Sequence, residues 1–238
     1  MKVVADPWLA DILQRDVYRL VVDPAQIGND SLRLNDLVER KPERPIFMYT
    51  KVATAALPIV KLIEQLGFNL IDTNIVFDKP ISSNPTIMGH CAVRFAMPDD
   101  EAQTVEVARQ NFIYSRFHLD SAISGEVAHT IKAEWVRNYF LGKRGQQMVV
   151  AVVDGAIAGF LQLLYRSDKT LTIDLIAVDQ AQRRKFIASD MIAYAETHCG
   201  QFKQIRVGTQ IANVPSLRLY EKIGFRVAEA QYVFHYHG

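Results

Sequence analysis

Apolar residues along this chain follow two different periods, one typical of helices and one typical of strands. Residues 170–178 are β-branched and largely apolar, which is typical of a strand buried on both faces. The second half of the chain is expected to contain a strand at 92–95, helices at 99–112 and 126–140, strands at 147–153, 157–165 and 171–178, a helix at 185–199, a strand at 204–211, a helix at 215–223 and a strand at 225–236. Elements in this order predict the α/β (α+β) class.

A polar, turn-rich stretch at residues 78–85 divides the chain. We expect a small N-terminal α/β domain over residues 1–84 and a larger domain over residues 85–238. With 238 residues, 49% of them hydrophobic, the chain is long enough to bury a core of this kind.

The first predicted domain repeats the end of the second at an offset of 157 residues. Residues 58–68 align with residues 215–225, and both copies predict a helix, a left-handed glycine cap and a strand. Ile63 stands in the first copy where Tyr220 stands in the second, so we expect the first copy to be a non-catalytic scaffold. Two unrelated units remain the alternative, because a Gly-Phe pair after a helix is common.

Asn213 and Tyr220 are seven residues apart, or two helical turns, so they share one face of the helix expected at 215–223. Gly224 supplies its C-cap. This order of residues is similar to the last helix of GNAT-type acyl-CoA N-acyltransferases. The resemblance implies that the asparagine touches the coenzyme arm and that the tyrosine hydroxyl faces the thioester sulfur. The alternative is an amphipathic helix in which Tyr220 and its leucine neighbours belong to the core.

The segment after the strand at 171–178 resembles the coenzyme loop of the same family, Val-Asp-(Pro)-x-x-Arg-Gly-x-Gly-x-Gly/Ala. In that loop, glycines let backbone N–H groups at a helix N-terminus approach the CoA pyrophosphate. Arg184 and Phe186 stand where the family has glycine, which leaves the loop geometry open. The basic run 183–185 is alternatively a solvated surface. The resemblance implies these coenzyme-binding residues: Ile176, Ala177, Val178, Arg183, Arg184, Lys185, Phe186, Ile187, Ala188, Asn213 and Tyr220.

The bulk numbers exclude several classes of function. A net charge of +1 gives no pull towards nucleic acid or an anionic membrane, and two distant cysteines suit a reduced, cytoplasmic setting. Residues 1–16 lack the apolar core of a signal peptide, and the longest aliphatic run, 148–153, is too short to cross a bilayer. For His235 and His237 no third metal ligand is evident, so we expect a frayed polar terminus and no metal.

The segment 112–120, together with the Thr209-Gln210 pair, resembles one GNAT branch, the nucleotide-sugar N-acyltransferases that modify dTDP-linked amino-dideoxyhexoses such as dTDP-4-amino-4,6-dideoxygalactose. The resemblance implies the GNAT fold, a mixed and mostly antiparallel sheet flanked by helices, with the N-terminal domain as a degenerate half-GNAT unit. It also implies acetyl-CoA or another short acyl-CoA as co-substrate, a role in O-antigen, lipopolysaccharide or related surface-polysaccharide synthesis, and a possible homodimer.

Aromatic and cationic side chains in segment 112–120 suit a nucleotide, because rings stack on thymine and arginine pairs with a diphosphate. Alternatively, the rings are core and Arg116 makes a structural ion pair. The expected substrate-binding residues are Tyr114, Arg116, Phe117, His118, Trp135 and Gln210.

The expected reaction is direct attack of a neutral amine on the thioester, without an acyl-enzyme. Tyr220 would act as the acid towards the thiolate, and backbone N–H groups near Ala177 and Val178 would hold the oxyanion. Asp174 or His118 would take the ammonium proton. A GNAT enzyme for another amine, such as a protein N-terminus or an aminoglycoside, and a non-catalytic CoA-binding protein remain as alternatives.

Overall fold

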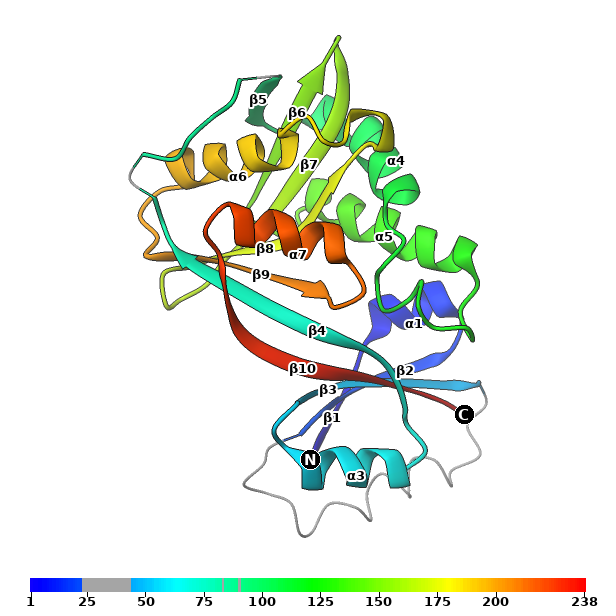
Figure 1. The fold of residues 1–238 in the computed structure, drawn as a ribbon. Helices are drawn as coiled ribbons and strands as arrows, with labels where there is room; N and C mark the ends of the chain where they lie inside the picture. The colour runs from blue at the N-terminus through cyan, green and yellow to red at the C-terminus, as the bar shows by residue number, and fades with distance from the viewer. Residues whose placement is uncertain (23–43, 83, 90) are drawn as a thin grey trace.

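The computed structural model describes residues 1–22, 44–82, 84–89 and 91–238. These residues form a ten-stranded sheet (Figure 1). In spatial order its strands are β1 (Lys2–Ala5), β2 (Asp16–Val21), β3 (Ile46–Ala53), β10 (Arg226–His237), β4 (Asn69–Pro80), β9 (Gln204–Gln210), β8 (Thr170–Val178), β7 (Ala156–Tyr165), β6 (Gln147–Val153) and β5 (Ala92–Phe95). Neighbours are antiparallel except β2–β3 and β8–β9, which confirms the predicted mixed, mostly antiparallel sheet.

The last strand, β10, lies in the middle of the sheet, between β3 and β4. The expectation of a frayed terminus is therefore wrong: His235 pairs with Tyr49 of β3 and Asn69 of β4, and its side chain is 0% exposed. Buried inter-strand pairing fixes these residues because every backbone polar group there needs a partner. The segments on either side of the predicted boundary near residue 84 therefore share one sheet.

Helices cover both faces of the sheet (Figure 1). Along β6, Met148 and Val150 pack in one cluster with α4 (Glu101–Asn111) and α5 (Gly125–Phe140). The alternate residues Val149 and Ala151 pack in another, with α6 (Ile187–His198) and α7 (Val214–Lys222), as the two-residue period of a strand requires. In the N-terminal part, α1 (Pro7–Leu13) and α3 (Leu57–Gln65) cover opposite faces in the same way.

The two copies of the predicted repeat have the same local structure. Gly67 follows α3 with φ +83°, and Gly224 follows α7 with φ +91°, so both glycines adopt the left-handed conformation that a helix cap needs. The strands that follow, β4 and β10, pair with each other. The helix, cap and strand of each copy are confirmed, while their origin in one ancestral unit stays a prediction.

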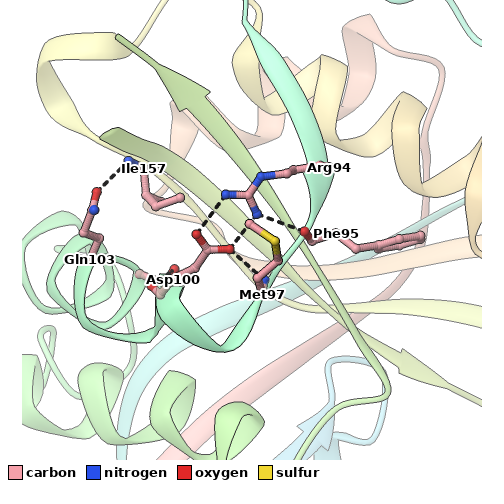
Figure 2. Close-up of polar contacts among 7 residues, drawn as sticks. Arg94, Phe95, Met97, Asp100, Gln103 and Ile157 are labelled. Atoms are coloured by element: carbon pink, nitrogen blue, oxygen red, sulfur yellow. Dashed lines mark hydrogen bonds and ion pairs between the residues drawn. The ribbon is translucent and has the colours of Figure 1, made fainter. Parts of the chain in front are cut away.

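A polar junction fixes the start of α4 against the edge of the sheet (Figure 2). Arg94 of β5 donates two hydrogen bonds to Asp100, at 2.6 and 2.9 Å, and the backbone N–H of Met97 donates to the same carboxylate at 2.7 Å. Hydrogen bonds from Arg94 hold the pKa of Asp100 below its usual range. Gln103 accepts from the backbone N–H of Ile157 at 2.9 Å, which ties α4 to β7. This anchoring matters for the site because the C-terminal end of α4 contacts the loop after β8.

Candidate active site

The sheet opens between β8 and β9. These parallel strands pair only from Thr170 to Ile173, although β8 continues to Val178. A cavity of about 1400 Å³ lies at this opening. Residues from both faces of the sheet line it, including Leu175 from the cluster under α4 and α5 and Tyr220 from the cluster under α7. The cavity is therefore bordered by residues from both faces of the sheet.

The loop after β8 keeps a glycine-type backbone without glycine. Arg184 has φ +65° and Phe186 has φ +60°, at the two positions where the family pattern has glycine. Left-handed backbone costs a non-glycine residue about 1 kcal/mol or more. Both residues therefore adopt the conformation that glycine adopts most easily, and the first turn of α6, whose N–H groups have no partner within the helix, lines the cavity through Ala188 and Ser189.

The basic residues of this loop have different positions. Arg183 donates from Nε to the Val178 carbonyl at 3.1 Å and from Nη2 to the Asn111 side-chain oxygen at 3.1 Å, so it fastens the loop to α4. Arg183 and Arg184 line the cavity. Lys185, which was expected to bind the coenzyme, is not among the lining residues and instead donates to Gln182 at 2.7 Å.

Asn213 and Tyr220 both line the cavity from α7. Asn213 is also the N-cap, because its side chain accepts from the Ser216 N–H. Tyr220 is 1% exposed and packs against Phe77 and Phe225. Burial raises the pKa of Tyr220, so its phenol is neutral and can donate. No hydrogen-bond partner for this hydroxyl occurs among the described residues, which leaves it available to a ligand.

Asp174, a candidate base, is held in an ion pair. It lies where the pairing of β8 with β7 shifts register, and such bulges redirect side chains. Arg144 donates to both of its oxygens, at 2.6 and 2.7 Å, and Trp135 Nε1 donates at 2.9 Å. Both carboxylate oxygens are therefore occupied by hydrogen bonds from the cavity wall.

His118, the other candidate base, does not line the cavity, whereas its neighbour Ser115 does. Ser115 Oγ lies 2.6 Å from His118 Nδ1, and His118 Nε2 lies 3.2 Å from His129 Nδ1. Burial, followed by the nearby His129 and Lys132, lowers the pKa of His118 to about 4, so the ring is neutral. Ser115, His118 and His129 therefore form a chain of polar contacts from the cavity wall to a partly exposed histidine.

Arg116 lines the cavity from the loop before α5, and two aromatic rings and the imidazole of His235 hold its guanidinium in place. Its guanidinium lies 3.9 Å from the Tyr49 ring centroid and 4.2 Å from that of Phe117. Nη1 lies 3.0 Å from His235 Nε2. Phe117 was expected to stack on a nucleobase, but it is 1% exposed and its face is taken by Arg116. Of the other predicted substrate residues, Tyr114, Trp135 and Gln210 line the cavity.

A cluster of Asp120, His235 and His237 contacts Arg116 through His235. Asp120 Oδ2 lies 2.6 Å from His235 Nδ1 and 2.8 Å from His237 Nε2. The other ring nitrogens face Arg116 and Arg15, which can only donate, so each histidine carries its proton towards Asp120. These three side chains have metal-ligand chemistry and spacing. The ring nitrogens of both histidines are engaged in hydrogen bonds, and the neighbouring guanidinium groups of Arg15 and Arg116 disfavour a further cation.

Sequence reasoning missed Lys51, Lys132 and Arg144, which also line the cavity. Lys132 carried a weak signal, since a lysine on the buried face of an amphipathic helix is uncommon. Lys51 carried none, because only the pairing of β3 with β10 brings it to the site.

Known proteins resemble this chain both in sequence and in fold. Residues 113–225 match the model of the Acetyltransferase (GNAT) family. This stretch of the chain is similar to that family, and the sheet and helices have the GNAT fold. The structure of a GCN5-related N-acetyltransferase from Sphaerobacter thermophilus superposes with a TM-score of 0.65 at 14% identity, covering 99% of this chain and 75% of that one. A tandem GNAT protein from the clavulanic acid biosynthesis pathway gives a TM-score of 0.62 at 14% identity, over 93% of this chain and 75% of that one.

A curated relative gives a nearer match in sequence. Over 140 residues the chain is 34% identical to the spore coat polysaccharide biosynthesis protein SpsD of Bacillus subtilis (strain 168). The alignment covers 58% of this chain and 48% of that protein, so the chain spans about half the length of the curated relative it matches. In the described part of the chain, no helix is both long and apolar enough to cross a membrane.

Proposed function

We propose that this chain transfers an acetyl or short hydroxyacyl group from acyl-CoA to the amino group of a dTDP-linked amino-dideoxyhexose. One observation carries the proposal: a single cavity is lined by the coenzyme-type loop, by Tyr220 and by the cationic residue Arg116. The first two suit a thioester donor, and the third suits a phosphorylated acceptor. Because both lie on one cavity, donor and acceptor can meet without an acyl-enzyme.

The residues of the coenzyme side fit a CoA molecule. The first turn of α6 and the left-handed backbone at Arg184 and Phe186 would hold its pyrophosphate, and Asn213 would contact its arm. When bound, acyl-CoA supplies a thioester carbonyl. Backbone N–H groups of β8 beyond Ile173, where β9 no longer pairs, would hold the oxyanion, and the Tyr220 hydroxyl would donate to the departing sulfur.

For the acceptor proton we propose the route through Ser115 and His118, rather than Asp174. Ser115 is the member of this chain that lines the cavity, and His118 behind it is neutral and hydrogen-bonded to His129. Asp174 is paired with Arg144 and hydrogen-bonded by Trp135, so its role would be to fix these two side chains in the cavity wall.

The acceptor class rests on the resemblance of segment 112–120 and on a polysaccharide-biosynthesis relative, whose printed name describes that protein alone. A role in surface-polysaccharide precursor synthesis, cytoplasmic location and a homodimer stay predictions. The non-catalytic alternative is less well supported, because Arg184 and Phe186 have the left-handed backbone that glycine would adopt and the Tyr220 hydroxyl has no partner within the described residues.

A thiol-release assay tests the proposal. We expect turnover with dTDP-amino-dideoxyhexoses and a short acyl-CoA, and little with aminoglycosides or peptide N-termini. Arg116→Lys keeps a cation but loses the bidentate fork, so KM for the nucleotide sugar should rise about 10-fold or more while Kd for CoA is unchanged. The matched control is Arg226→Lys, at an exposed arginine outside the cavity. Efficient turnover of another amine class, or none, would refute the acceptor assignment.

A further inference from the structure

Lys132 is a buried cation without an acidic partner of its own. It projects from α5, it is 7% exposed, and its Nζ lies 4.9 Å from the ring centroids of both Phe112 and Trp135. No carboxylate lies within 4.0 Å of its Nζ among the described residues. By contrast, Lys79 pairs with the buried Glu196 at 2.9 Å. A buried ammonium is strongly disfavoured unless something compensates it.

The charged groups around Lys132 are mostly cations. Arg116, Arg144 and Lys51 all oppose its charge, and Asp174 favours it. Asp174 is already engaged by Arg144 through two hydrogen bonds. Desolvation, together with these neighbours, lowers the pKa of Lys132 to about 7.

Lys51 brings a second lysine to the same place from the N-terminal part of the chain. It lies on β3 opposite Val233 of β10, and both side chains line the cavity. Lys51 is exposed within the cavity, where desolvation and then the charges of Arg116 and Arg19 lower its pKa to about 8. Asp72 of β4 favours its charge, but that carboxyl is itself held towards the protonated form by burial.

We infer that Lys51, Arg116 and Lys132 form a subsite for the diphosphate of the acceptor nucleotide, and that the N-terminal segment is part of the acceptor site rather than only a scaffold. The inference rests on the proposed function and extends it to residues that the sequence did not single out. A diphosphate supplies the anionic oxygens that this cluster lacks. CoA carries the same group, but the loop and helix N-terminus suited to it are Arg184 and residues 186–189, which line the cavity from other elements than β3 and α5.

Binding of an anion here has a measurable consequence. An anion beside Lys132 raises the pKa of its ammonium, and at pH 8 a group with a pKa of about 7 is roughly nine-tenths deprotonated before binding. Nucleotide binding should therefore take up about one proton at Lys132 and about half a proton at Lys51 at pH 8. The affinity should fall as the pH rises above 7, because more of the lysine must be protonated.

Titration calorimetry with dTDP on the whole chain saturated with CoA tests this. The titration is repeated at pH 8 in two buffers of different ionisation enthalpy, which gives the proton uptake. We expect binding with uptake in the native chain. Lys132→Met keeps the length and apolar stem, and should weaken dTDP binding at least 10-fold, remove most of the uptake and raise the melting temperature by removing a buried charge. Lys51→Met should also weaken binding, whereas Lys61→Met, an exposed residue of α3, should change nothing.

Three outcomes would overturn the inference. If CoA abolishes dTDP binding, or if Lys132→Met weakens CoA instead of dTDP, the cluster serves the coenzyme. If Lys132→Met changes the affinity of neither dTDP nor CoA, Lys132 has only a structural role. If nucleotide sugars turn over but the Lys132→Met and Lys51→Met variants keep the native KM, the subsite is wrong and the proposed function stands. If dTDP binds as expected but no nucleotide sugar is acylated, the proposed function fails while the subsite stands.

Discussion

Removal of the Tyr220 hydroxyl should separate catalysis from stability. Tyr220→Phe deletes one oxygen from a side chain that is 1% exposed and packs between Phe77 and Phe225. The ring and its contacts are kept. Among the described residues the hydroxyl has no hydrogen-bond partner, so its loss breaks no bond within that part of the protein.

The two expected magnitudes follow from this geometry. A positioned acid contributes about 10² to 10⁴ in rate, so kcat should fall at least 100-fold, or by about 2.7 kcal/mol in transition-state stabilisation. KM for acyl-CoA should change little, because the hydroxyl acts as the thiolate forms. A buried hydroxyl without a partner costs about 1–3 kcal/mol, so the variant should be as stable as the native chain or slightly more stable.

Rapid-quench kinetics and thermal unfolding measure the two effects. Tyr165→Phe is the matched control, because the Tyr165 hydroxyl is hydrogen-bonded to the Cys199 side chain and lies outside the cavity. That control should lose about 1 kcal/mol of stability and keep its kcat. An unchanged kcat in Tyr220→Phe would remove Tyr220 as the acid. A large drop in melting temperature would mean that the hydroxyl has a structural role.

Three further predictions concern the loop, the scaffold and the pH dependence. Arg184→Gly should relieve left-handed strain of about 1 kcal/mol, and Arg184→Gln should not. If the Arg184 charge contacts the CoA phosphates, both variants should raise the Kd for CoA, measured by calorimetry, and make it less dependent on salt. Kd values equal to that of the native chain would mean that Arg184 is part of a solvated surface. Ile63→Ala, at a fully buried position, should cost about 2–5 kcal/mol in urea unfolding with activity per folded molecule intact, and lost activity would contradict the scaffold role. Burial, partly offset by Asp120, lowers the pKa of His235 to about 4. Between pH 4 and 6.5 the unfolded chain then binds a proton that the folded chain does not, so stability should rise with pH by on the order of 3 kcal/mol, and His235→Gln should flatten that slope.

The elements of the proposed coenzyme side could be predicted because their signals are local in sequence. The strand at 170–178, the loop after it and the Asn213–Tyr220 helix each lie within about a dozen residues, and each formed as expected. The local pattern failed to settle one point. Glycine is absent at Arg184 and Phe186, yet the surrounding anchors, such as the Arg183 bonds to Val178 and Asn111, hold the backbone in the left-handed region.

The acceptor side could be predicted only in part because its residues meet through pairing between distant strands. Arg116 stood out as chemistry in a loop, but its partners Tyr49 and His235 are far away in sequence. The pair His235 and His237 looked like an exposed tail because nothing near it in sequence indicates that β10 lies between two other strands. Register between strands separated by many residues depends on the whole hydrophobic pattern, which a local reading does not contain.

The position of β10 explains why both halves of the chain contribute to one site. On the face that lines the cavity, Val233 of β10 lies opposite Lys51 of β3, and Gln231 lies opposite Asn74 of β4. If β10 were an edge strand of the second half alone, Lys51 would have no route to the cavity between β8 and β9. Insertion of the last strand between two strands of the first segment brings a cation from the N-terminal part beside Arg116 and Lys132. The sheet connectivity, and not a separate binding domain, therefore joins the proposed acceptor side of the cavity to the proposed coenzyme side.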